Sequence, residues 1–277
     1  MRSPMEDNLK EDYKEGRLIL FVGAGVSANL GLPTWSKLID HLADELGYDP
    51  DVFKIYGNFL VLAEYYRIKN GNIEKLINWM CKEFNGLKID ISVSKIHEFI
   101  ANGNFPIVYT TNYDNLIEMS YDYYKKEYIK IVNVSDISKS TASSCREIVK
   151  FHGDFSDVNS IVLDETSYYE RLQFETPLDI KLRADVLGKS VLFIGYSLQD
   201  INIRHLFYRL TNLWNNYGGG SEKPKSYIFS SRDNPIQEEV MKQWGIQTIN
   251  SRKDDPSEAL RDFLRELVYD QDKNCVK

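Results

Sequence analysis

Short apolar runs alternate along this chain with segments of helical periodicity, and this alternation limits the folds that the chain can adopt. Strands that are separated by helices pair side by side in the same direction. We therefore expect an α/β protein with a Rossmann-like, doubly wound and mostly parallel sheet. The expected strands are Arg17–Val22, Pro106–Thr110, Glu147–Phe151, Ser190–Ile194, Ser226–Phe229 and Gln247–Ile249.

The helical segments are unevenly distributed between these strands. Apolar residues recur at helical spacing from Trp35 to Leu46, and Gly47 ends that run. Residues 49–102 read as several helices without a convincing strand, so we interpret them as a helical insertion or cap within a single domain that spans residues 1–277. Further helices are expected around residues 114–126, 201–213 and 257–268.

The bulk composition argues against several classes of function. The formal net charge is −7 and the pI is near 5.3, so the chain gains no counterion release from nucleic acid, and we expect no direct nucleic-acid ligand. No run approaches the roughly 20 apolar residues that span a bilayer. The charged N-terminus also lacks the apolar core of a secretory signal. We expect a cytoplasmic protein that does not enter a membrane.

The cysteines do not indicate a metal centre. Cys81, Cys145 and Cys275 lie far apart, and the chain has no C-x-x-C pair. This spacing predicts isolated reduced thiols, with neither a structural zinc site nor a disulfide framework.

Four polar segments directly follow four of the expected strands. Because the carboxyl ends of parallel strands meet at one edge of a sheet, where ligands of open α/β sheets bind, we expect these segments to converge. They are Gly23-Ala24-Gly25-Val26-Ser27, Thr110-Thr111-Asn112-Tyr113-Asp114, His152-Gly153-Asp154 and Gly195-Tyr196-Ser197.

The segment from Gly23 to Ser27 has two readings. Glycine lets the main chain approach a pyrophosphate, and a helix that follows offers N–H groups to the anion. Many turns between a strand and a helix also carry two glycines for structural reasons alone. The preceding strand and Ser27 favour phosphate binding.

His152 is a candidate proton acceptor, because an imidazole titrates near neutral pH. A partly buried histidine that bonds a backbone carbonyl is the alternative, and the place of His152 after a strand favours function. His41, His97 and His205 fall within helical patterns, where packing or solvent-facing roles are expected.

Asn112 and Asp114 also have structural alternatives. Either side chain can close a turn, and Asp114 would make a reasonable cap for the helix that follows. A purely structural role is less expected for Asn112 than for Asp114, since its neutral amide offers both a donor and an acceptor to a hydroxyl group or a water.

Taken in order, the four segments resemble the sirtuin family, specifically its bacterial anti-phage NAD-hydrolase branch, which lacks the zinc module. The family motifs G-A-G-x-S, T-x-N-x-D, H-G and G-x-S stand here at Gly23–Ser27, Thr110–Asp114, His152-Gly153 and Gly195–Ser197. Their order, spacing and position after strands agree over most of the chain.

The resemblance implies that NAD is the substrate, with no cofactor and no zinc. The residues expected to hold the NAD phosphates are Gly23, Ala24, Gly25 and Ser27. Asn112 and Asp114 would face the nicotinamide and its ribose, and His152 the ribose hydroxyls or a water. Gly195 and Ser197 would lie on the adenosine side.

Two departures from the protein-deacylating sirtuins bear on the reaction. Those enzymes usually have glutamine where Thr111 stands, so the ribose contacts differ. They also carry a zinc module with two C-x-x-C pairs, which is missing here, and its absence argues against their usual groove for an acyl-lysine peptide.

We therefore predict an NAD hydrolase that cleaves the nicotinamide–ribose bond, a regulated NAD-depleting effector of anti-phage defence by analogy with sirtuin-like proteins that lack the module. Asn112 would position the ribose and the attacking water, and His152 would be the general base. Asp114 would support the cationic sugar electrostatically. The alternatives are an NAD-dependent protein deacylase or ADP-ribosyl transferase, and a non-catalytic module that senses NAD or ADP-ribose.

An NAD-depleting activity harms its own host, so regulation is expected. Related sirtuin-like chains act beside a HerA-type ATPase, a short Argonaute or a fused sensor domain. Because this chain ends soon after its last expected helix, we predict a homo-oligomer or a separate regulatory protein, with a HerA-type ATPase as the first candidate.

Overall fold

The computed structural model describes residues 4–140, 145–171, 175–196, 201–217, 223–251 and 253–269. Its strands are β1 Leu18–Val22, β2 Ile107–Thr110, β3 Tyr128–Ile131, β4 Arg146–Lys150, β5 Ser190–Ile194, β6 Ser226–Ser230 and β7 Ile246–Asn250. Its α-helices are α1 Pro4–Lys14, α2 Trp35–Leu46, α3 Pro50–Ile55, α4 Phe59–Asn70, α5 Glu74–Asn85, α6 Lys95–Asn102, α7 Leu116–Tyr123, α8 Val134–Ser140, α9 Glu165–Arg171, α10 Pro177–Gly188, α11 Ile201–Tyr217, α12 Pro235–Gln243 and α13 Pro256–Tyr269.

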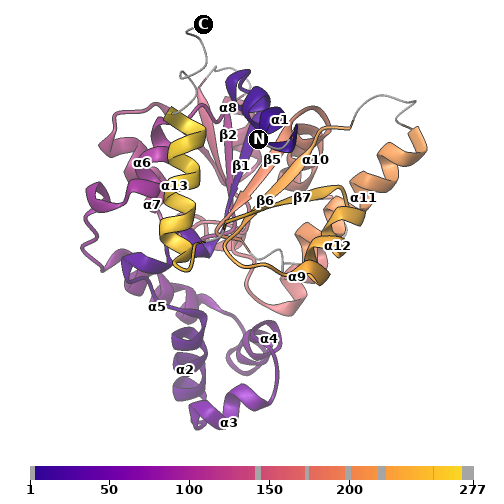
Figure 1. The fold of residues 1–277 in the computed structure, drawn as a ribbon. Coiled ribbons are helices and arrows are strands. Elements are labelled where there is room, and N and C mark those ends of the chain that lie inside the picture. Colours follow the sequence, from indigo (N-terminus) through magenta and orange to yellow (C-terminus); the bar gives the residue numbers. More distant parts are fainter. Residues whose placement is uncertain are drawn as a thin grey trace, which may run out of the picture.

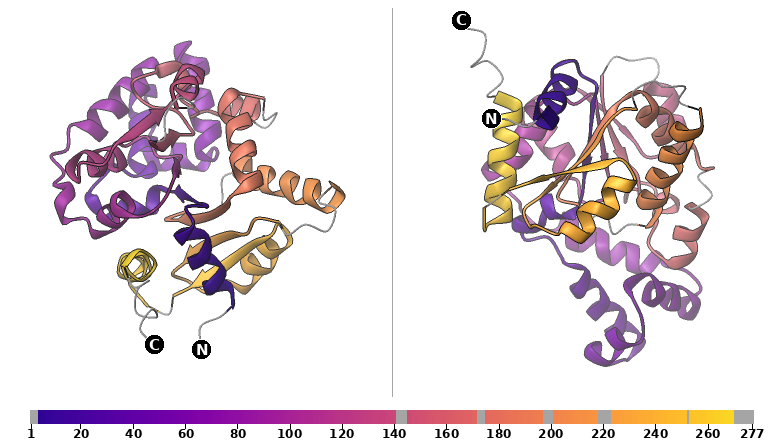
Figure 2. Two further views of the ribbon diagram at one scale, coloured as in Figure 1. Left: turned by 90° about the horizontal axis from the view of Figure 1, so that it is seen from above. Right: turned by 45° about the vertical axis from the view of Figure 1, so that its right-hand side comes forward.

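The seven strands form one sheet in the order β3-β4-β2-β1-β5-β6-β7, and every pairing is parallel. Helices cover both faces, with α13 on one side and α10 to α12 on the other (Figures 1 and 2). The predicted α/β class and doubly wound parallel sheet are confirmed.

Strand β1 shows how the two faces are built. Leu18, Leu20 and Val22 point into a core that includes residues of α1, α6, α7 and α13. Ile19 and Phe21 point into a second core, against α10, α11 and α12. All five residues are buried, as expected for a central strand of a sheet that is covered on both sides.

Strand β3 was not among the expected strands. Its sequence, YIKI, contains a lysine, and only Ile131 is fully buried. A half-buried edge strand has a weaker apolar signal than a central one. The helix expected around residues 114–126 is also shorter, since α7 ends at Tyr123 and Lys125 adopts a φ of 54°.

Residues 49–102 form α3, α4, α5 and α6, with no strand. Helices α2 to α5 share a third core, which also includes Tyr113, Ile161 and Leu163 from the sheet's loops. We refer to residues 35–85 as the helical unit, and α2 to α4 project beyond the sheet (Figure 1). Helix α6 instead packs in the first core with α7 and α13.

His97 lies on α6 and is fully buried, which agrees with the packing role expected for it. Its Nδ1 atom is 2.7 Å from Oγ of Ser94, the residue that caps the helix. Burial lowers the pKa of His97 to about 4, although the charge of Asp114 acts in the opposite direction.

We predict that His97 makes the fold less stable in mild acid. The unfolded chain takes up this proton near the ordinary pKa of 6.5, whereas the folded chain takes it up only near 4. The unfolded state therefore binds more protons between these values, and stability falls as the pH decreases through that window. Between about pH 7.5 and about pH 5 the loss from this group is about 2 kcal/mol.

Urea unfolding of the wild type and His97→Gln at both pH values measures the effect. The variant should lose about 2 kcal/mol less than the wild type over the same interval. An equal loss in both proteins would mean that His97 does not cause the pH dependence.

Candidate active site

The four polar segments that follow strands, the last of them described only to Tyr196, lie side by side. The strands that precede them, β4, β2, β1 and β5, are consecutive neighbours in the sheet. Because all four run in the same direction, their carboxyl ends bring the segments to a single edge. This is the convergence that the alternation of strands and helices predicts.

The loops after β1 and β5 are in direct contact. The N–H of Gly23 donates to the carbonyl of Ile194 at 3.0 Å, and the N–H of Gly25 donates to the carbonyl of Gly195 at 2.9 Å. A Cβ atom on Gly23 would lie 2.5 Å from the Gly195 oxygen, and one on Gly195 would lie 2.5 Å from the Val26 nitrogen. Gly195 also adopts a φ of 58°, which L-residues rarely do.

These contacts explain, without any ligand, why glycines stand at these positions. The N–H groups of Val26 and Ser27 also donate within the segment, to the carbonyls of Gly23 and Ala24. Ala24 and Gly25 are exposed, whereas Ser27 is buried. Phosphate binding by this segment stays a prediction, as does the adenosine role of Gly195. Ser197 lies outside the described residues.

Asn112 lies in a loop whose start is fixed by β2. The hydroxyl of Thr110 donates to the Val22 carbonyl at 2.9 Å and accepts from the Asn112 N–H at 3.0 Å. The Asn112 side chain is buried, and its Nδ2 donor has no hydrogen-bond partner among the described residues. Leaving such a donor unsatisfied costs about 1–3 kcal/mol. An unsatisfied buried amide is therefore a candidate contact for a ligand.

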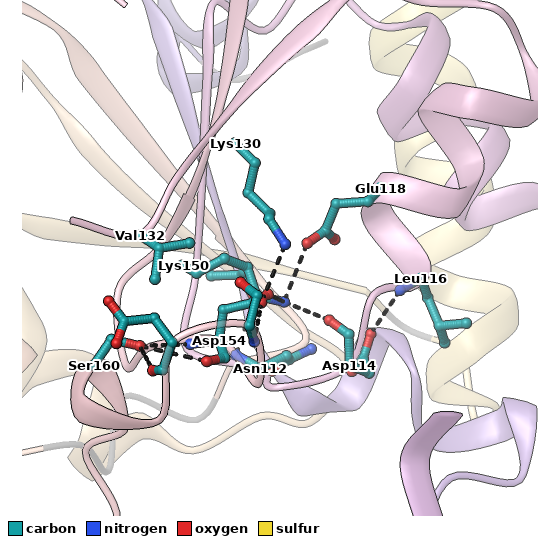
Figure 3. Close-up of polar contacts among 12 residues, drawn as sticks. Asn112, Asp114, Leu116, Glu118, Lys130, Val132, Lys150, Asp154 and Ser160 are labelled. Atoms are coloured by element: carbon teal, nitrogen blue, oxygen red, sulfur yellow. Dashed lines mark hydrogen bonds and ion pairs between the residues drawn. The ribbon is translucent and has the colours of Figure 1, made fainter. Parts of the chain in front are cut away.

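Asp114 acts at the start of α7. Its Oδ1 atom accepts a hydrogen bond from the Leu116 N–H at 3.1 Å (Figure 3). The cap residue of α7 is Asn115 and not Asp114, but this bond gives Asp114 a structural role at the start of the helix. A role for Asp114 toward a ligand stays a prediction.

His152 is buried directly after β4, between two aromatic rings. Its ring lies 5.9 Å from that of Phe151 and 5.2 Å from that of Tyr168 on α9. The Tyr168 hydroxyl is 3.4 Å from Nδ1 of the imidazole. These contacts fix the plane of the ring.

Hydrogen bonds through Val162 connect the loop that carries His152, after β4, with the loop that carries Asn112, after β2. The Val162 N–H donates to the His152 carbonyl at 3.0 Å. The Val162 carbonyl accepts from the hydroxyl of Tyr113, next to Asn112, at 2.6 Å. The two candidate catalytic residues are thus held on one connected framework. Trp35 of the helical unit also contacts Tyr113, with ring centroids 6.3 Å apart.

Arg171 is a residue near the site that the sequence did not single out. This buried guanidinium donates to both carboxylate oxygens of Asp179, with Nη2 to Oδ1 at 2.6 Å and Nε to Oδ2 at 3.2 Å. It also donates to the Phe151 carbonyl at 2.8 Å and lies over the Phe151 ring. Arg171 therefore fixes the main chain directly before His152.

Asp154 adds a carboxylate to the loop that carries His152. Burial by itself would raise the pKa of Asp154, but hydrogen bonds from Ser156 and the charges of Lys150 and Lys130 hold it below the usual value. The group is therefore an anion near neutral pH. Among the described residues, no cluster of three or more His, Cys, Asp or Glu could hold a metal ion. Within the same ranges no helix is long and apolar enough to cross a membrane.

Comparison with known proteins identifies the family of this chain. The family model described as a SIR2-like domain matches residues 106–249, which include the Asn112 and His152 loops. The chain belongs to the SIR2-like family. A solved structure described as a Sir2 homologue–NAD complex aligns with 96% of this chain and 94% of that chain, with a TM-score of 0.48 and 16% identity.

Curated relatives of this SIR2-like chain have names that refer to NAD or to defence. The NAD(+) hydrolase ThsA of Enterococcus faecium is 31% identical over 199 residues, which cover 71% of this chain and 40% of that protein. Defense-associated sirtuin 2 of Bacillus subtilis is 31% identical over 205 residues, which cover 72% of this chain and 20% of that protein. The ThsA of Bacillus cereus (strain MSX-D12) is 27% identical over 210 residues, 76% of this chain and 43% of that protein. The SIR2-like chain thus spans less than half the length of these relatives.

We predict that the contact between the β1 and β5 loops does not tolerate a side chain. Gly195→Ala would combine an unfavourable φ with a clash and should cost about 2–5 kcal/mol of stability. Gly47 is a matched control, because it has a φ of 76° but nothing within 4 Å of an added Cβ. Gly47→Ala should cost only the backbone strain, about 1–2 kcal/mol. Urea unfolding measures both, and equal losses would contradict the packing argument.

Proposed function

We propose that this chain hydrolyses NAD at the bond between nicotinamide and ribose. The observation that carries the proposal is the placement of Asn112 and His152 on two connected loops at the ends of the neighbouring strands β2 and β4. The names of the ThsA relatives support NAD as the substrate and hydrolysis as the reaction.

The proposed reaction needs few groups from the protein. The bond between the ribose C1′ atom and the nicotinamide nitrogen breaks, and its electron pair leaves with nicotinamide. A water oxygen forms a new bond to C1′, and the proton that it loses passes to a base. The products are nicotinamide and ADP-ribose. Because positive charge grows on the sugar as the bond breaks, the site must hold the ribose and limit the access of other water.

Asn112 supplies the polar contact to the ribose or to the attacking water. Its Nδ2 donor is buried and lacks a hydrogen-bond partner among the described residues, so an acceptor on the substrate would satisfy it. His152 supplies the base, and Tyr168 and Phe151 fix the orientation of its ring. Asp114 lies in the same loop as Asn112, and in this proposal its carboxylate supplies negative charge near the cationic sugar.

The loops after β1 and β5 form the remaining part of the proposed site. Exposed Ala24 and Gly25 lie where these loops touch, beside the Asn112 loop. In this proposal the dinucleotide runs along the edge of the sheet, with its phosphates near Gly23–Ser27 and its nicotinamide near Asn112 and His152.

A regulated, NAD-depleting role in anti-phage defence is part of the proposal. It is supported by the family resemblance and by the name of Defense-associated sirtuin 2. Control by self-assembly or by a separate partner, with a HerA-type ATPase as the first candidate, stays a prediction from the resemblance.

We predict that Asn112→Ala and His152→Ala both lose most NAD turnover. Loss of the base should lower the rate by about 10²–10⁴-fold, and loss of the amide donor by about 10²–10³-fold. The measurement is nicotinamide release from NAD by the purified chain, alone and with products of neighbouring genes. His41→Ala is the control, since this histidine stacks on Trp79 within the helical unit.

The products separate the rival functions. Equal turnover in the wild type and both variants would remove Asn112 and His152 from the mechanism. Formation of acetyl-ADP-ribose from an acetylated peptide would indicate a deacylase. Binding of NAD without any loss of NAD would indicate a sensing module.

A further inference from the structure

Lys150 is a fully buried lysine at the carboxyl end of β4, two residues before His152. Its Nζ atom lies 3.5 Å from Oε1 of Glu118 on α7 and 4.0 Å from Oδ2 of Asp154. The same ammonium donates a hydrogen bond to the main-chain carbonyl of Asp114 (Figure 3).

A charge at this position is expensive for the fold. Ile148, two residues earlier on the same face of β4, is part of an apolar core, so an apolar side chain would suit position 150. Desolvation of a buried ion costs several kcal/mol, and replacing a buried ion pair by apolar residues is often neutral or stabilising. Stability alone therefore gives no reason for a lysine here.

The contact with Asp114 supplies a different reason. The loop from Thr110 to Leu116 is anchored at its start by Thr110 and in its middle by Tyr113. Lys150 anchors its end, and it is the charged member of the three anchors. A hydrogen bond from an ammonium is stronger than one between neutral groups.

Lys150 also connects the strand that precedes His152 with the loop that carries Asn112. Its backbone belongs to β4, which leads directly into His152, while its side chain reaches the loop that carries Asn112. The position of the ammonium is fixed by Glu118 on one side and by Asp154 on the other. Asp154 is also paired with Lys130 at 3.1 Å, so its charge does not depend on Lys150 alone.

We propose that Lys150 is a positioning residue, whose buried ammonium holds the Asp114 carbonyl and so sets the Asn112 amide against the His152 imidazole. This inference rests on the proposed function for its effect on catalysis, but not for its effect on the loop. Glu118 is the counter-ion that makes the buried charge tolerable.

Two variants separate positioning from charge balance. Lys150→Met removes the ammonium at similar volume but leaves Glu118 buried without its partner, which is destabilising. The double variant Lys150→Met/Glu118→Gln removes both charges, while Asp154 keeps Lys130. It should regain stability relative to the single variant, but it cannot restore the hydrogen bond to Asp114.

The first measurement is hydrogen exchange of the main-chain amides in residues 111–116, which needs no activity. In the double variant we expect exchange in this segment to increase about tenfold, with the rest of the sheet unchanged. Unchanged exchange at residues 111–116 would overturn the proposal, whatever the activity.

The second measurement is steady-state NAD hydrolysis. We expect kcat of the double variant to fall about 10²-fold, because a small misplacement of reacting groups has effects of this size. KM should change by less than about threefold, since the β1 and β5 loops are not touched. A double variant with the kcat of the wild type would overturn the proposal.

Lys181→Met is the matched control. Lys181 also contacts two carboxylates, Glu147 at 2.7 Å and Asp185 at 3.0 Å, but it reaches β4 near the opposite end of the strand. It should lose stability without changing kcat or the exchange of residues 111–116. A wild type that does not hydrolyse NAD, either alone or with products of neighbouring genes, together with faster loop exchange in the double variant, would refute the proposed function and support the loop anchor.

Discussion

Parallel pairing throughout the sheet is the constraint on which the rest of this structure depends. It puts every strand's carboxyl end at the same edge, so segments separated by more than 80 residues in the chain become neighbours there. The order β4-β2-β1-β5 makes four of these ends consecutive. No single motif needs to form a complete site, because the order of the strands brings the four motifs next to one another.

The class of fold and the convergence of the four motifs could be predicted from the sequence. Central strands such as β1 and β5 are buried on both faces, so their apolar runs stand out against the surrounding pattern. The polar segments then mark where each strand ends. Candidate residues such as Asn112 and His152 are proposed in this way, because ligands of open α/β sheets bind at the carboxyl ends of the strands.

The remainder depends on tertiary contacts that leave little trace in the sequence. Strand β3 is an edge strand with a half-buried, partly polar sequence, so its periodicity is weak. Gly23 is needed because of the Gly195 carbonyl, and Gly195 because of the Val26 nitrogen, so both needs arise across about 170 residues of chain. Lys150 did leave a signal, since it is a charge within the apolar run EIVKF, but its partners Glu118 and Asp114 could be known only from the fold. Arg171 lay in a segment for which no element was expected.

The helical unit is attached to both halves of the candidate site. Trp35 contacts Tyr113 in the Asn112 loop, and Glu64 of α4 accepts hydrogen bonds from Thr166 on α9, the helix that carries Tyr168. Arg67 adds an ion pair with Asp164 at 3.2 Å, just before α9. A rigid-body tilt of the helices at residues 35–85 would therefore displace the neighbours of the Asn112 amide and of the His152 imidazole together. The helical unit therefore contacts both the loop that carries Asn112 and the helix that carries Tyr168, so a change in its position would alter the surroundings of both candidate catalytic residues.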